Sequence, residues 1–191
     1  MKKTTKGKTV PSRKAPARTP RAGSAPAPSR QRIRGRTVVV YYSRFGATAT
    51  VARGIAQALG CELREIRTHR RRSWFAMGFG SVFNIRHRIE AMDFDFTGCG
   101  LVVICSPIWI AKPACPVMTF LDAAKLQGTR SALVFTTREG GVERTVDVMK
   151  GILEVRGSQV IASESIPTRR VPEDILRARA REFALELKKR Y

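Results

Sequence analysis

The sequence between Val38 and Thr48 constrains the fold more than any other part of this chain. It begins with an apolar, β-branched run that is typical of a strand buried on both faces of a parallel sheet. The strand pattern breaks at a small, polar turn around Gly46, and a helical pattern follows at once. In such a strand–turn–helix, the backbone N–H groups of the turn converge near the positive end of the helix dipole. The turn therefore predicts a binding site for an anionic group.

Strands and helices alternate along the chain after residue 36. Apolar runs predict five strands, at 37–43, 61–67, 101–105, 131–135 and 159–162. Helical spacing predicts helices at 47–59, from about 114, at 142–155 and from about 172. The alternation favours an α/β fold, a doubly wound five-stranded parallel sheet with helices on both faces. Because ligands of such sheets bind beyond the carboxyl ends of the strands, we expect the functional site in the loops there.

Three of these loops carry residues suited to a flavin. The first, at 43–48, offers backbone amides and hydroxyls to a terminal phosphate, and it lacks the glycine and lysine patterns of dinucleotide and Walker-type sites. The second, at 106–111, places an aromatic side chain where a flat ring could stack, and the third, at 136–141, has two glycines that let the backbone approach a ring closely. Together they predict FMN as the cofactor. The candidate cofactor-binding residues are Ser43, Arg44, Phe45, Gly46, Ala47, Thr48, Pro107, Ile108, Trp109, Ile110, Thr136, Thr137, Arg138, Gly140 and Gly141.

The same residues resemble the flavodoxin-like family. Residues 39–48, V-V-Y-Y-S-R-F-G-A-T, are similar to the flavodoxin FMN-phosphate loop, commonly written Y-Y-S-R-T-G-N-T. Residues 106–121 resemble the G-[ST]-P-[IV]-W…P-x-x-P-V-x-x-F-L signature of short bacterial flavodoxin-type proteins, and residues 135–141 resemble their third flavin loop. Arg70-Arg71-Arg72-Ser73 resembles a basic stretch that follows their second strand. The resemblance covers residues 37 to about 165. It implies electron transfer or flavin-dependent oxidoreduction with a redox partner protein or a small-molecule electron acceptor.

Two positions depart from the family pattern. Phe45 stands where a threonine hydroxyl would bond the phosphate, and Ala47 replaces the usual asparagine. The loss of one hydrogen bond to a charged group costs about 1.5–3 kcal/mol, or roughly ten- to a hundredfold in affinity. We therefore expect weaker FMN binding through the remaining backbone amides. A degenerate flavodoxin-like subunit without FMN and an NAD(P)H-dependent quinone or nitro reductase are the alternatives.

Positive charge is the second pronounced feature of the chain. Its 191 residues carry a formal net charge of +21 with a pI near 11.2. Residues 1–36 hold twelve Lys or Arg and no acid, and the 24 basic and 15 acidic residues of 37–191 leave a net charge of +9. The composition of 1–36 predicts a disordered basic tail ahead of one domain at 37–191. The tail could be a polyanion-binding arm, an inert extension or a targeting segment.

The tail and Arg70–Arg72 together favour contact with nucleic acid or an anionic surface, so an interaction module on a flavodoxin-like scaffold is a second hypothesis. Residues 68–90 mix arginines with aromatic residues at helical spacing, which predicts a crossover helix packed on the sheet. A membrane-surface segment, a cover over the ligand pocket and a homodimer face are its alternatives.

No apolar run is long enough to span a bilayer, and the N-terminus lacks the core of a secretory signal, so we expect a cytoplasmic protein. The four cysteines show no metal-binding spacing and are expected to be reduced and buried.

Overall fold

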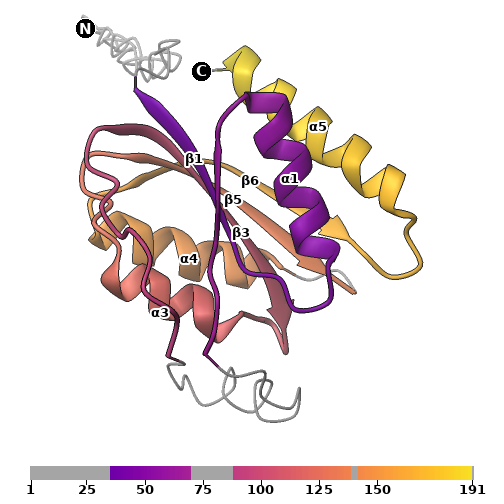
Figure 1. Cartoon of the computed structure of the whole chain (residues 1–191), viewed down its shortest axis with the longest axis horizontal. Coiled ribbons are helices and arrows are strands. Elements are labelled where there is room, and N and C mark those ends of the chain that lie inside the picture. The colour runs from indigo at the N-terminus through magenta and orange to yellow at the C-terminus, as the bar shows by residue number, and fades with distance from the viewer. Residues whose placement is uncertain (1–34, 70–87, 139–141, 191) are drawn as a thin grey trace, which may run out of the picture.

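Figure 1 shows a computed structural model of the chain, which describes residues 35–69, 88–138 and 142–190. The strands are β1 (Arg36–Tyr41), β2 (Glu62–Glu65), β3 (Cys99–Trp109), β4 (Lys112–Pro113), β5 (Arg130–Thr137) and β6 (Gln159–Pro167). The helices are α1 (Ala47–Leu59), α3 (Cys115–Ala123), α4 (Glu143–Val155) and α5 (Glu173–Arg190). Residues 1–34 of the predicted basic tail and the Arg70–Arg72 block lie outside the described residues, and Arg36, the last residue assigned to the tail, begins β1.

Five strands form the parallel sheet that the sequence predicts. Their spatial order is β2-β1-β3-β5-β6, and the short β4 pairs antiparallel with the end of β3. The α1 and α5 helices cover one face of the sheet, and α3 and α4 cover the other (Figure 1). The direction in which successive strands are added reverses between β1 and β3, since β2 lies on one side of β1 and all later strands on the other.

The sheet is buried on both faces, which explains the uninterrupted apolar run in β1. Val38 and Val40 belong to the core under α3 and α4, whereas Val39 belongs to the core under α1 and α5. All three valines are fully buried. Each successive side chain of β1 thus enters a different half of the core, as the period of two along a strand requires.

The α1 and α5 helices pack at unusually close range. A Cβ atom added to Gly54 of α1 would lie 2.9 Å from the Cβ of Ala180 on α5, closer than two carbon atoms can approach. Thr50 Oγ1 donates a hydrogen bond of 3.0 Å to Glu173 Oε1 at the start of α5. The two helices are therefore joined by backbone proximity and by a polar contact at one end.

The predicted strand ends were too early at three places. The third predicted strand continues past Cys105 to Trp109, the fourth includes Thr136 and Thr137, and the fifth continues past Ala162 to Pro167. The extra residues complete parallel ladders: Pro107 lies opposite Thr136, and Thr137 opposite Pro167. Prolines and hydroxyl residues at the end of a strand predict a loop. In the structure, pairing with the neighbouring strands keeps these residues in the sheet.

The apolar residues of α5 divide between the core and the surface. Phe183 and Leu187 are buried, whereas Ile175 is 44% exposed and Ala178 is exposed. Leu176 and Ala180 are buried in their place. The close approach to Gly54 fixes the rotation of α5, because only a small residue such as Ala180 fits at the crossing.

The segment expected to form a crossover helix lies mostly outside the described residues, which exclude 70–87. Its two ends meet, since Thr68 and Ile89 form an isolated antiparallel bridge. None of the four cysteines, all of which lie in described segments, forms a disulfide; three are buried, and Cys61 is partly exposed. None of the described helices has the length and apolar character needed to cross a membrane.

Candidate functional site

The turn before α1 has the geometry of an anion-binding helix start. Gly46 is the N-cap residue, with a φ of 95° and a ψ of −35°, and no side chain caps the helix. The first turn of α1 carries no acidic residue. Because the first amides of a helix have no intrahelical acceptor, those of Ala47 and Thr48 are left for an external group. The donor set thus fits a phosphate.

Two hydroxyls of this turn already have hydrogen-bond partners. The Gly46 amide donates to Ser43 Oγ over 3.2 Å, which leaves the Ser43 hydroxyl proton able to donate elsewhere. Thr48 Oγ1 lies 2.6 Å from Thr136 Oγ1, in a buried hydrogen bond between α1 and β5. The Thr48 hydroxyl therefore ties the helix start to the sheet, and the outward donors are backbone amides and Ser43.

The second predicted loop is a strained hairpin. β3 continues to Trp109, and the chain then turns through Ile110 and Ala111 into β4. Both turn residues adopt the left-handed conformation, with φ values of 49° and 55°, as a two-residue type I′ turn requires. A β-branched residue at positive φ is a genuine outlier, and such strain clusters at functional sites. Thr145 Oγ1 of α4 donates a 2.8 Å hydrogen bond to the Ala111 carbonyl and holds the hairpin in place.

Tyr42 joins the first two predicted loops, although it was not among the candidates. The ring of Trp109 meets the ring of Tyr42 edge to face, with centroids 5.9 Å apart and planes at 84°. Burial raises the pKa of Tyr42, and the charge and hydrogen bond of Arg44 act in the opposite direction. The Arg44 guanidinium also lies 5.8 Å from the centre of the Phe45 ring, which is 79% exposed. The second tyrosine of the Tyr-Tyr-Ser sequence was the available signal for this role.

The third predicted loop begins later than expected. Thr136 and Thr137 are buried at the end of β5, and the Thr168 amide donates a 2.8 Å hydrogen bond to the Thr137 carbonyl. Arg138 follows as an exposed residue, and Gly140 and Gly141 lie outside the described residues. Beyond β5, the structure therefore describes only Arg138 of this loop, and the two glycines predicted to approach a ring are not described. In the described part of the chain, no group of His, Cys, Asp or Glu side chains could hold a metal ion.

No family model matches this chain, and no curated protein sequence matches it. Solved structures do match. A flavoprotein in complex with FMN from Lactobacillus acidophilus NCFM superposes with a TM-score of 0.60 at 23% identity, over 69% of this chain and 93% of that chain. The fold is flavodoxin-like. Oxidised flavodoxin 2 from Bacillus cereus matches with a TM-score of 0.55 at 15% identity, and the Trp repressor binding protein from Bacillus subtilis with 0.59 at 14%. In both comparisons the alignment covers 82% of this chain and 99% of the other.

In a flavodoxin-like sheet, the crevice for a ligand lies where the strand order reverses, between β1 and β3. The turn at residues 43–48 and the Trp109 hairpin follow these two strands, and Tyr42 connects them. The end of β5 reaches the same edge through the contact between Thr48 and Thr136. The fold thus brings the described residues of all three predicted loops together at the carboxyl-terminal end of the sheet.

Proposed function

We propose that this protein binds FMN and carries out electron transfer or flavin-dependent oxidoreduction. The observation that carries the proposal is the uncapped start of α1, which lies beside the Trp109 hairpin at the reversal of strand order. A helix start of this kind attracts a phosphate, and a tryptophan at the next strand end offers a stacking surface to a flat ring. The similarity to a flavoprotein in complex with FMN supports the same cofactor.

The chain's residues would divide the binding between phosphate and ring. The Ala47 and Thr48 amides and the Ser43 hydroxyl would hold the phosphate, because they are the donors left at the turn. Trp109, oriented by Tyr42, would flank the ring. The positive charges of Arg44 and Arg138 would favour added negative charge nearby. When bound, FMN supplies one- or two-electron redox chemistry, and the protein sets access and potential.

Titration with FMN tests this proposal. Wild-type protein should show flavin absorbance after purification or quench FMN fluorescence at micromolar concentration. Trp109→Ala should weaken FMN binding about tenfold, since it removes an aromatic stacking surface. Val155→Ala is the matched control, because Val155 is 87% exposed at the end of α4 and should leave affinity unchanged.

The departures at Phe45 and Ala47 give a second arm. Phe45→Thr with Ala47→Asn should strengthen binding roughly ten- to a hundredfold for each hydrogen bond that is restored at the turn. If neither the wild type nor this double variant binds FMN, the proposal of a flavin site is wrong. NAD(P)H oxidation with quinone or nitro acceptors then separates a reductase from an electron carrier.

Charge favours a second candidate function, the binding of nucleic acid or another polyanion. Residues 37–191 alone carry +9, and residues 1–36 add twelve basic side chains without an acid. Binding to DNA should weaken steeply with salt, with a slope of about −0.9 per phosphate neutralised. A salt-independent profile, or the absence of binding at low salt, would exclude this role.

A further inference from the structure

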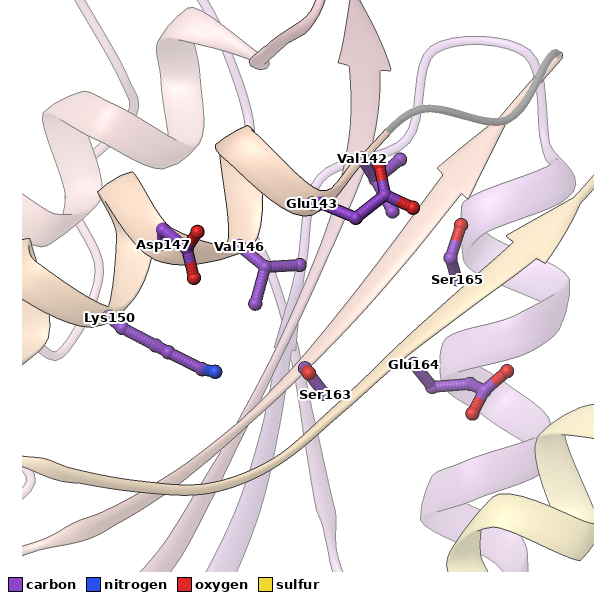
Figure 2. Close-up of a pocket in the computed structure, with 8 residues that line it drawn as sticks. All are labelled: Val142, Glu143, Val146, Asp147, Lys150, Ser163, Glu164 and Ser165. Carbon is purple, nitrogen blue, oxygen red and sulfur yellow. The ribbon is translucent and has the colours of Figure 1, made fainter.

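A cavity of ≈ 300 Å³ lies between α4 and the edge strand β6, and none of its residues belongs to the candidate flavin site. Figure 2 shows the helix on one side of this space and the strand on the other. The cavity is lined chiefly by Glu143, Asp147 and Lys150 from α4 and by Ser163, Glu164 and Ser165 from β6. Val146 contributes an apolar surface next to them. The lining suits a polar, extended segment better than an apolar one.

The strand beside this cavity has an open edge. Among the described residues, β6 pairs with β5 alone, although it runs for nine residues from Gln159 to Pro167. Ser163 and Glu164 are exposed along it. An open strand edge presents unpaired N–H and C=O groups, and an added extended segment pairs with them through its own backbone.

The charge of the cavity is opposite to that of the protein. Glu143, Asp147 and Glu164 form no ion pair with any described residue, and Lys150 is the one basic side chain among the lining residues. The local charge is thus −2, within a domain whose residues 37–191 carry +9. An occupant that pairs with the strand edge should therefore be positively charged.

We propose that residues 2–10 of this chain bind in an extended conformation along β6, over the cavity. This stretch contains no proline, so every one of its amides can pair with a strand edge. Lys2, Lys6 and Lys8 stand at even positions, and with a period of two they share one face of an extended segment. Ammonium groups on that face can pair with the carboxylates of Glu143 and Asp147 on α4, whereas Glu164 points away from α4 (Figure 2).

The chain is long enough for this contact within one molecule. Residues 11–34 span up to about 80 Å when extended, and a domain of this size is about 40 Å across. A flexible tether of this kind supplies an effective concentration in the millimolar range, so even a weak contact is populated. The proposal does not depend on FMN binding.

Zero-length carbodiimide cross-linking of the full chain tests the proposal. Isotopically light and heavy chains are mixed, cross-linked at low salt and digested, and the amide cross-links are located by mass spectrometry. Lys2, Lys6 and Lys8 should couple to Glu143 and Asp147 within single chains. Glu143→Gln should lower the cross-link yield at Asp147 roughly 1.5- to 5-fold, because it removes one of the two attracting charges. Glu154→Gln, at an exposed position of the same helix, is the matched control and should change nothing.

Hydrogen exchange supplies a second readout. The edge amides of residues 163–165 should exchange more slowly in the wild type than in a variant with Lys2, Lys6 and Lys8 changed to alanine. Light-to-heavy cross-links at the frequency expected for random pairing of chains would assign the edge to a second copy and overturn the proposal. Equal coupling to Glu154 and to the cavity carboxylates, or exchange that the lysine variant leaves unchanged, would overturn it as well.

Discussion

The hairpin turn at Ile110 and Ala111 should be a reservoir of strain that substitution can release. A type I′ turn needs positive φ at both central residues, and Asn-Gly is the sequence that adopts it most readily. We predict that Ile110→Asn with Ala111→Gly stabilises the folded protein. The Ile110 side chain is 66% exposed, so its removal forfeits little burial. The hydrogen bond from Thr145 to the carbonyl of residue 111 is kept, because the acceptor belongs to the backbone.

The expected gain follows from the two φ values of 49° and 55°. The left-handed conformation costs an L-residue about 1–2 kcal/mol, and glycine returns roughly 0.5–1 kcal/mol of this as lost backbone entropy. For the two residues together, we therefore expect a net gain of about 1–3 kcal/mol in the free energy of unfolding for the double variant. For a domain of this size, that raises the melting temperature by about 2–12 °C.

Urea denaturation measures the gain, and the m-value should stay unchanged. Arg170→Asn is the control for strain outside the site, since Arg170 has a φ of 56° in the connection between β6 and α5. Both variants should be stabilised. If FMN binds as proposed, only the hairpin variant should lose FMN affinity, by about fivefold or more, because it removes an apolar side chain beside Trp109. The claim that this turn stores strain would be refuted if the Arg170 variant were stabilised while the free energy of unfolding of the hairpin variant stayed within about 0.5 kcal/mol of wild type.

Three further predictions concern the core and the sheet. Gly54→Ala should lower the free energy of unfolding by about 1–3 kcal/mol, because its Cβ would lie 2.9 Å from the Cβ of Ala180, and this outweighs the better helix propensity of alanine. Adding Ala180→Gly should restore most of this loss, as measured by urea denaturation. Burial raises the pKa of the Cys105 thiol, so the unfolded chain releases its proton first. The free energy of unfolding should therefore fall as the pH rises above about 9, and Cys105→Ala should remove up to about 1.4 kcal/mol per pH unit of that slope. Thr136→Val should cost about 1–3 kcal/mol by leaving the buried Thr48 hydroxyl without its partner, and the Thr48→Val, Thr136→Val pair should cost less than the two single changes together.

The sheet could be predicted from the sequence because its buried strands consist of uninterrupted apolar runs, a pattern that is visible without knowledge of the tertiary contacts. Val38, Val39 and Val40 are buried in both halves of the core, so a plain apolar run is the correct signature for them. The helix start at Gly46 was equally readable, since a glycine between a strand and a helical pattern marks a turn.

The limits of the strands could not be predicted in the same way. Thr136 and Thr137 have the composition of a loop, and they are held in β5 by partners in β3 and β6 that are distant in sequence. The positive φ values of Ile110 and Ala111 contradict their intrinsic preferences, so no local rule would place a turn there. The rotation of α5 depends on the contact of Ala180 with Gly54, which lies 126 positions earlier.

The close pairing of α1 with α5 has a consequence for the synthesis of this domain. The α1 helix packs against α5, residues 173–190, which follow every strand of the sheet along the chain. During translation, the sheet and helices α3 and α4 can therefore assemble before α5 is available to pack against α1. The turn at residues 43–48 should thus become rigid in one of the last steps of folding of the nascent chain.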